Sequence, residues 1–248
     1  MVETIHHLFI FFGSFGSGDL AVHSLQAENW KSDMAGFFIT FEGIDFCGKT
    51  TQARKLLSYL KRKGYKVLLV REPGGDGVAE GIRRILLSRR NSQMTALTEL
   101  LLYEASRSQL TQRVILPALK EDKVVICDRY SDSSLAYQGY GRGLNKKMIK
   151  QLNHISTFGL WPDLTILLDL PVKTSFKRRS KEKREKDRLE KERFEFHQRI
   201  RGGFLRIAQQ NRRRIKVVGG TANIDKTWQK VRKVVDSFLS KSHRSKDK

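Results

Sequence analysis

The sequence has few of the residues that mark a secreted or membrane protein. It has two cysteines among 248 residues, Cys47 and Cys127, which is too few for a disulfide framework. It has no apolar run near the roughly 18 residues that a transmembrane helix needs. These absences exclude a disulfide-rich secreted domain and a helical membrane protein. We therefore expect a cytoplasmic protein with no membrane partner.

Acidic residues are also scarce relative to basic ones. The chain has 26 Asp and Glu against 48 Lys and Arg, and its formal net charge is +22. Such an excess of positive charge suits an acidic ligand, either a nucleotide or a nucleic acid. The length is sufficient for one sizeable core or two small ones.

The first 33 residues lack the features of a known targeting segment. The apolar run at 7–12 is too short to span a membrane, and a Gly- and Ser-rich stretch follows it at 13–18. A signal peptide begins with basic residues, but the early charge here is Glu3, and a transit peptide is rich in arginine, which this segment lacks. We expect residues 1–33 to be a dispensable extension before a core that starts near Met34.

The clearest motif is a phosphate-binding loop that fits the pattern G-x-x-x-x-G-K-[ST]. It consists of Gly43, Ile44, Asp45, Phe46, Cys47, Gly48, Lys49 and Thr50. An apolar, aromatic run at 37–42 precedes it, and apolar residues at helical spacing follow over 51–63, so the order is strand, turn, helix. Backbone N–H groups at such a turn can bind phosphate, Lys49 can reach the β- and γ-phosphates, and Thr50 can hold Mg²⁺. The motif predicts an ATP site, and the alternative is a Gly-rich turn that matches by chance.

Strands and helices alternate from Phe37 onward without long linkers. Further strands are predicted at 67–71, 124–128, 164–169 and 215–218, and helices at 78–87, 94–121, 144–156, from about 172 to 210, and 224–239. Continuous apolar strands separated by helices indicate a parallel sheet covered on both faces. We predict an α/β fold of the P-loop type with five parallel strands, as one domain over 34–240. The ligands should lie beyond the carboxyl ends of the strands.

Three clusters of polar residues accompany the loop, two of them at strand ends. Residues 71–75, Arg-Glu-Pro-Gly-Gly, follow the second strand. Residues 128–130, Asp-Arg-Tyr, follow the third, and Ser133, Ser134, Tyr137 and Gln138 come next. Each could be a surface ion pair, but three around one loop favour a site. In the third cluster, Tyr103 and Arg107 share one helix face, which fits a planar base with a carbonyl edge; alternatively, Tyr103 is a core residue.

In this order, the motifs resemble those of the thymidylate kinases of the bacterial type. The matching motifs are Phe41–Asp45, Arg71–Gly75, Tyr103–Arg107, Asp128–Gly139 and Asp187–Glu190. The resemblance runs from Phe37 to about Leu239. It implies transfer of the γ-phosphoryl group of ATP to dTMP with Mg²⁺, giving dTDP for dTTP synthesis, by an enzyme that forms homodimers.

The resemblance also implies a role for each matching residue. The catalytic residues would be Lys49, Arg129 and Arg188, and the loop residues 43–50 would bind ATP. The residues that would bind dTMP are Asp45, Arg71, Tyr103, Arg107, Arg129, Ser134, Tyr137 and Gln138. Among these, Asp45 would face the 3′-hydroxyl, Tyr103 would stack on thymine and Arg107 would contact its O4 atom. Thr50 and Asp128 would hold the metal.

A strongly basic segment, at about 172–193, is expected to form a lid over ATP. It carries many lysines and arginines, with glutamates between them, so the alternative is a solvated charged helix. Arg188 lies in the Asp-Arg-x-Glu element that the family places in the lid.

Two loop residues depart from the family pattern. Phe46 stands where bacterial-type relatives usually have Gly, so it could crowd the loop or pack beneath the lid. Cys47 sits at a helix N-terminus, which can lower the pKa of a thiol, or it is a simple substitute for a small residue.

Two other functions remain open at this point. One is a kinase for another nucleotide or for a nucleoside. The other is a basic nucleic-acid-binding protein, since the run 212–214 and the tail 241–248 are rich in Lys and Arg. No nucleic-acid motif accompanies these runs, so we expect no dedicated nucleic-acid partner and a solvated tail.

Overall fold

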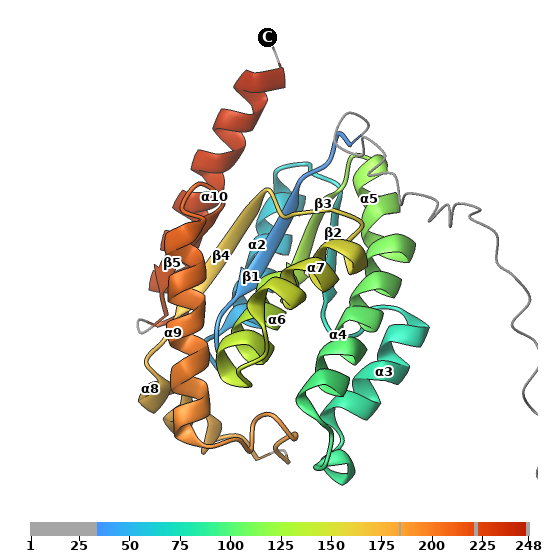
Figure 1. The fold of residues 1–248 in the computed structure, drawn as a ribbon. Helices are drawn as coiled ribbons and strands as arrows, with labels where there is room; N and C mark the ends of the chain where they lie inside the picture. The colour runs from blue at the N-terminus through green and yellow to red at the C-terminus, as the bar shows by residue number, and fades with distance from the viewer. Residues whose placement is uncertain (1–33, 184, 221–222, 247–248) are drawn as a thin grey trace, which may run out of the picture.

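The computed structural model describes residues 34–183, 185–220 and 223–246. The expected extension at 1–33 and the last two residues of the basic tail lie outside these ranges. The part of the chain that is described forms a central sheet with helices packed on both of its faces (Figure 1).

The sheet has five parallel strands, as the sequence predicts. They are β1 (Phe38–Glu42), β2 (Val67–Arg71), β3 (Val124–Asp128), β4 (Leu164–Asp169) and β5 (Ile215–Gly219). Their order is β2-β3-β1-β4-β5, so β1 lies at the centre between β3 and β4. Every residue of β1 is buried, which explains why its apolar residues, Phe38, Ile39 and Phe41, lie on both faces of the sheet rather than on one.

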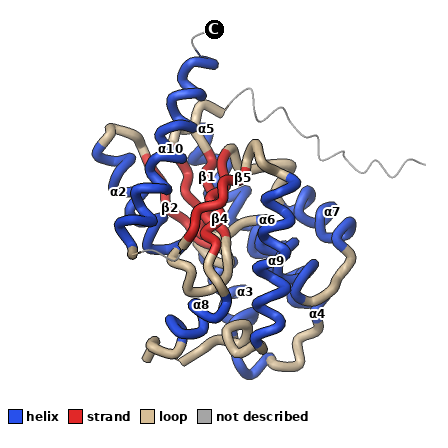
Figure 2. The backbone as a smooth tube through the Cα atoms, turned by 90° about the vertical axis from the view of Figure 1, so that its left-hand side faces the viewer, coloured by secondary structure: helices blue, strands red, loops and turns tan. Residues whose placement is uncertain are grey.

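Helices of two groups cover the sheet. The α-helices are α2 (Lys49–Arg62), α3 (Gly77–Leu87), α4 (Ala96–Leu110), α5 (Leu116–Lys120), α6 (Ser131–Ser134), α7 (Lys146–Ser156), α8 (Val172–Arg179), α9 (Phe194–Gln210) and α10 (Ile224–Lys246). The 3₁₀-helix η1 (Arg89–Asn91) and the π-helices η2 (Thr111–Ile115) and η3 (Leu135–Gly141) complete the set. Figure 2 shows α2 and α10 on one side of the strands and α6, α7 and α9 on the other. None of the described helices combines the length and apolar composition of a membrane span.

One helix prediction was wrong. The sequence predicts continuous helix from about 172 to 210, but α8 ends at Arg179 and α9 begins at Phe194. The intervening segment turns at Asp187 and Glu190, where the Asp187 N–H donates to Glu190 Oε2 at 3.2 Å and the Glu190 N–H donates to Asp187 Oδ1 at 2.9 Å. Such reciprocal side-chain bonds satisfy backbone groups outside a helix, so the segment needs no helical ladder.

The region after β3 is helical, which the sequence did not predict. Residues 131–141 form α6 and η3, and nearly all of them are buried. The stretch is rich in Ser, Gly and Tyr and has no helical apolar stripe, because it is covered on all sides. Its wide π turns lie against α9 and carry several of the expected site residues toward the sheet edge.

Candidate active site

A cavity of about 1290 Å³ opens at the carboxyl ends of the strands. It is lined by the phosphate-binding loop after β1, the residues after β2 and β3, Tyr103 of α4, and residues of the segment between α8 and α9. The cavity therefore lies where a parallel sheet of this type is expected to bind its ligands.

The phosphate-binding loop depends on two glycines. A Cβ atom on Gly43 would lie 2.5 Å from the carbonyl oxygen of Leu168, and the φ of Gly43 is +136°. Gly48 is the N-cap of α2 with φ 100°. Lys49, the first residue of α2, is buried, and its Nζ donates to the Ile44 carbonyl at 2.9 Å. The lysine thus bridges the loop from inside and faces the cavity.

The backbone explains why glycine suits the position of Phe46. Phe46 has φ 58°, in the left-handed region that non-glycine residues rarely adopt. Its half-buried side chain lines the cavity, and its carbonyl accepts a bond from Arg178 Nη1 of α8 at 3.0 Å. The residue is therefore both strained and in contact with the base of the expected lid.

Neither cysteine is activated. Cys47 is buried, and burial raises the pKa of its thiol despite the charge of nearby Lys49. The net effect on this pKa is thus opposite to the lowering that a helix N-terminus can cause. This favours the alternative, in which Cys47 substitutes for a small residue. Cys127 is fully buried in β3, and burial also raises the pKa of its thiol well above the usual value.

Thr50 and Asp128 provide oxygen atoms suited to Mg²⁺. The Thr50 hydroxyl donates to Asp128 Oδ2 at 2.5 Å, and both residues line the cavity beside Lys49. Mg²⁺ is usually bound by one or two protein oxygens together with water and substrate phosphate, so this pair fits the ion. Among the described residues, no group of three or more His, Cys, Asp or Glu side chains could hold a metal without such a substrate.

Arg129, Asp45 and Tyr137 form a bonded group at the centre of the cavity. Arg129 Nη2 donates to Asp45 Oδ1 at 2.5 Å and to the Tyr137 hydroxyl at 3.1 Å, and that hydroxyl lies 3.0 Å from Asp45 Oδ2. Burial of Asp45 alone would raise the pKa of its carboxyl, but the positive charges of Arg129 and Lys49 outweigh burial and lower it to about 2. Asp45 is therefore ionised, and three predicted residues meet in one place.

Two arginines stand at the opposite wall. Arg71, at the end of β2, pairs with Glu80 at 2.9 Å, and its side chain is half exposed. Arg83 of α3 donates to the Pro73 carbonyl at 2.9 Å and also lines the cavity. Sequence reasoning missed Arg83, because it lies within a helix rather than at a strand end.

Arg107 is buried in a network of polar groups. Its guanidinium donates to Glu72 Oε2 (2.9 Å), Glu104 Oε1 (2.7 Å), Ser134 Oγ (2.9 Å), Asn153 Oδ1 (2.9 Å) and the Tyr130 carbonyl (3.3 Å). Only 1% of the Arg107 residue surface is exposed. The structure thus places Arg107 behind the cavity wall, whereas Tyr103, Ser134 and Gln138 line it.

The network also changes one ionisation. Burial raises the pKa of Glu72 to about 8, although Arg107 acts in the opposite direction. Its second oxygen, Oε1, has no hydrogen-bond partner within the described residues. When Glu72 carries a proton it is neutral. The positive charge of Arg107 is then balanced by Glu104 alone.

Arg188 lies away from the phosphate-binding loop. Its Nη1 pairs with Glu99 Oε2 at 2.6 Å and its Nε donates to the Leu86 carbonyl at 3.1 Å. It does not belong to the described cavity wall, where the basic residues of the 172–193 segment are Arg178 and Lys181. The structure therefore does not bring Arg188 together with Lys49 and Arg129.

The residues after β5 also line the cavity, and sequence reasoning missed them. They are Gly220, Asn223, Ile224, Asp225 and Thr227. The strand-end rule applied to β5 would have found them, because this strand also points its carboxyl end at the cavity.

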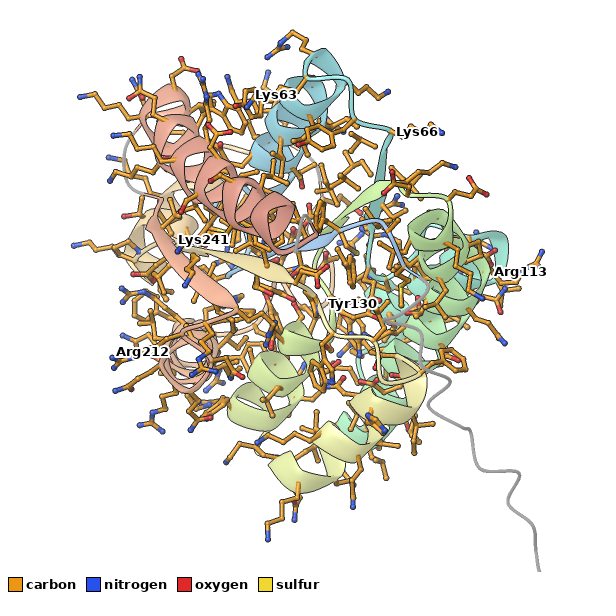
Figure 3. The ribbon with its side chains drawn as sticks, turned by 90° about the horizontal axis from the view of Figure 1, so that it is seen from above. Lys63, Lys66, Arg113, Tyr130, Arg212 and Lys241 are labelled. Carbon is orange, nitrogen blue, oxygen red and sulfur yellow. The ribbon has the colours of Figure 1, made fainter. Side chains whose placement is uncertain are left out.

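The basic run at 212–214 is only partly free. Arg214 forms a two-bond pair with Asp132, at 2.7 and 2.9 Å, and is a structural residue. Exposed basic residues lie around the periphery, while Tyr130 lies in the interior (Figure 3). Those labelled there are Lys63, Lys66, Arg113, Arg212 and Lys241.

Comparison with known proteins gives one consistent result. The sequence model of one family, described as "Thymidylate kinase", matches residues 41–231. The chain is 51% identical over 198 residues to a thymidylate kinase of Geotalea daltonii, covering 77% of this chain and 92% of that protein. It is 46% identical over 206 residues to one of Caldanaerobacter subterraneus subsp. tengcongensis, covering 83% and 98%. The crystal structure of thymidylate kinase from Ehrlichia chaffeensis resembles it with a TM-score of 0.66 and 36% identity, over 81% of this chain and 98% of that one.

Proposed function

The chain belongs to the thymidylate kinase family and phosphorylates dTMP to dTDP with ATP, and from this premise we propose how its cavity carries out the reaction. One observation carries the proposal. The phosphate-binding loop with Lys49 and the group of Arg129, Asp45 and Tyr137 face the same cavity. A triphosphate bound at the loop and a monophosphate bound beside Arg129 would lie next to each other in this cavity. Lys49 would then face the donor phosphates and Arg129 the acceptor phosphate.

On the donor side, loop N–H groups and Lys49 would bind the ATP phosphates. The positive end of α2 adds to this attraction. Thr50 and Asp128 would hold Mg²⁺, which when bound screens charge on the donor phosphates. Residues 223–227 would contact the rest of ATP, because they line the same part of the cavity wall as Gln52 of α2.

On the acceptor side, we propose that Arg129 and Arg71 bind the phosphate of dTMP. Two polyanions repel each other strongly, so cations that approach the acceptor phosphate lower the barrier to transfer. Asp45 would accept a bond from the 3′-hydroxyl, because its low pKa keeps it ionised. Tyr103 would stack on thymine, with Ser134 and Gln138 along the same wall.

Arg107 would act on the base from behind this wall. Its five N–H groups already have protein acceptors, so a bond to thymine O4 would replace one of these, such as the bond to Ser134 Oγ, which lines the cavity. Arg188 stays a prediction as the catalytic cation of the lid, because in this structure its guanidinium binds Glu99. Arg178 and Lys181, which line the cavity, are the cations nearest to the loop from the lid.

The test is a substrate panel with the full chain. Turnover of dTMP, dUMP, UMP and thymidine is measured with ATP and Mg²⁺, and with EDTA as the metal-free control. We expect phosphorylation of dTMP far above the other three and loss of activity with EDTA. Equal turnover of UMP would contradict the proposed acceptor pocket, and thymidine as the preferred substrate would contradict the proposed phosphate site.

We further propose a cytoplasmic homodimer. Val78 and Ile85 of α3 and Leu97 and Leu101 of α4 are 46–60% exposed, and these two helices pack side by side. An exposed apolar face on paired helices suits a second copy of the chain. The two free, buried cysteines are consistent with a reducing compartment. Sedimentation of the wild-type chain and of Leu101→Glu tests the dimer, and a monomeric wild type would contradict it.

A further inference from the structure

Glu99 of α4 is a fully buried carboxylate with an unusual number of partners. Gln138 Nε2 donates to it at 2.8 Å, Arg142 Nε and Nη2 at 3.2 and 3.1 Å, and Arg188 Nη1 lies 2.6 Å from its Oε2. Burial alone would raise the pKa of Glu99, but the bonds from Arg142 and Gln138 and the two arginine charges outweigh it and lower the pKa. Glu99 is therefore an ionised group in the interior.

The partners of Glu99 come from two different parts of the molecule. Gln138 and Arg142 belong to η3 and its C-terminal end, which are part of the body of the protein. Arg188 belongs to the segment between α8 and α9, and so does Glu192, which pairs with Arg142 Nη1 at 2.6 Å. The Arg188 N–H also donates to the Leu87 carbonyl, at 3.4 Å, at the end of α3.

This segment crosses the cavity from one wall to the other. In α8, just before this segment, Ser175 Oγ donates to the Asp45 carbonyl in the phosphate-binding loop at 2.8 Å. At its far end, Arg188 and Glu192 are bound to Glu99 and Arg142. Between these two attachments, Asp187, Leu189 and Glu190 form part of the cavity wall. Release of the Glu99 end would therefore open the cavity on the side of α3 and α4.

The charges allow this release without an unpaired buried ion. The cluster contains two carboxylates and two guanidiniums, so it is neutral as a whole. When Arg188 and Glu192 leave together, Glu99 and Arg142 remain as a neutral pair, bound to each other at 3.1 Å. A buried pair that loses one partner is costly, but here a complete pair stays behind. An isolated salt bridge between Glu99 and Arg188 would instead leave Glu99 buried without a partner when Arg188 moved away.

Glu99 also lies on the same face of α4 as the proposed base pocket. Glu99, Tyr103 and Arg107 are four residues apart, so they form one stripe on the helix. Gln138, which donates to Glu99, lines the cavity with Tyr103. A ligand that contacts Tyr103 and Gln138 therefore contacts two residues next to Glu99.

We propose that Glu99 is a positioning residue for the reaction, which fastens residues 187–192 across the acceptor side of the cavity by binding Arg188. It holds that segment closed when dTMP is bound and touches neither substrate. The proposal rests on the function proposed above, in which residues 172–193 form the lid.

The test is Glu99→Gln in the full chain, compared with Arg188→Gln. Glutamine keeps an oxygen for Gln138 and Arg142 Nε but presents an amide where Oε2 binds Arg188 Nη1 and Arg142 Nη2. Arg188→Gln removes the lid contact and leaves the bonds between Glu99 and Arg142 in place. Trypsin cleavage after Lys181, Lys183 and Lys186 is followed by mass spectrometry, with dTMP and a non-hydrolysable ATP analogue present or absent. We expect cleavage with ligands bound to be about tenfold faster in either variant, and KM for dTMP to rise about tenfold.

The double variant separates this role from a general loss of stability. If Glu99 acts through Arg188, adding Glu99→Gln to Arg188→Gln changes cleavage and KM less than about twofold. Glu195→Gln, an exposed glutamate at the start of α9, makes the same charge change and should match the wild type. Arg188→Gln alone tests the contact if Glu99→Gln does not fold.

Each outcome decides between the proposals. Wild-type cleavage rates in both single variants, or additive effects in the double variant, overturn the role of Glu99. If the ligands fail to slow cleavage in the wild type, residues 172–193 are not the lid, and both proposals fail together. If the ligands protect the wild type and Glu99→Gln equally, only the role of Glu99 is wrong.

Discussion

The acceptor side of the cavity and the segment that crosses it are built in opposite ways. On the acceptor side, Arg107 and Arg129 are held by several protein acceptors each, and the Arg107 side chain is 1% exposed. In the crossing segment, Lys181 and Lys183 are exposed, and the pair Arg89–Glu185 is 46% and 76% exposed. Of the described part of this segment, only the far end, around Arg188, is buried. The acceptor side is therefore held by buried bonds throughout, whereas the crossing segment is held by buried bonds at its ends and is exposed between them. A segment attached in this way can open by release of one end, as the lids of many kinases do.

The largest expected effect is a loss of stability when Arg107, on the acceptor side of the cavity, is replaced. Arg107→Ala would leave Glu72 and Glu104 buried without their shared guanidinium, so we expect the free energy of unfolding to fall by about 3–5 kcal/mol. Urea unfolding measures this. Arg71→Ala is the matched control, because its pair with Glu80 is exposed and should contribute at most about 1 kcal/mol. Similar decreases in the free energy of unfolding for Arg107→Ala and Arg71→Ala would mean that the buried ion pairs of Arg107 contribute no more to stability than an exposed pair.

Lys49→Ala should affect catalysis more than stability. The lysine is the cation that the loop provides for the donor phosphates, so we expect turnover to fall on the order of 10²-fold or more. Its amino group bonds to the Ile44 carbonyl at 2.9 Å and to Cys47 Sγ at 3.7 Å, both within the loop, so the melting temperature should change little. Initial rates at saturating dTMP and ATP, with thermal unfolding in parallel, check both parts. Near-normal turnover would refute the donor-site assignment.

Glu72→Gln should change the pH dependence of stability. The pKa of Glu72 is about 8 in the folded protein against an ordinary value of 4.5, so the folded state keeps a proton that the unfolded state gives up. The free energy of unfolding from this group therefore falls as pH rises from about 4.5 to 8, by at most about 1.4 kcal/mol per pH unit. In Glu72→Gln this decline should be reduced. Parallel pH profiles for variant and wild type would show that Glu72 is ionised throughout.

The smallest expected effect concerns Phe46, where the loop and the lid base meet. Phe46→Gly removes the ring and the left-handed strain, whereas Phe46→Ala removes the ring alone. We expect the glycine variant to be more stable than the alanine variant by about 1 kcal/mol. Both should bind ATP more weakly than the wild type if the ring packs under the lid. Equal stability of the two variants would show that the backbone conformation costs nothing here.

The sequence predicts the sheet well because each strand is a short, mostly apolar run with a clear end. Residues 124–128 and 164–169 were placed without error, and the strand-end rule led to Asp128 and Arg129. The break between α8 and α9 was not predictable, because a run of charged residues has helical composition whether or not it is helical. The partners of Arg107 and Arg188 could not be predicted from the sequence either. Both depend on residues such as Glu72 and Glu99 that come together only through tertiary packing.

The strand order has a consequence for how the protein is made. No two strands in this sheet are paired closer in sequence than Thr165 and Ile215, which are 50 positions apart (215 − 165), and β1 pairs first with β3, where Phe38 meets Val125 across 87 positions (125 − 38). A ribosome therefore delivers the whole phosphate-binding loop well before the strand that must support it. A nascent chain that stops before residue 124 carries every residue of the ATP motif yet has no sheet to hold them, and long-range pairing of this kind makes folding slow. We expect nucleotide to protect nascent chains from protease only after β3 and β4 have emerged.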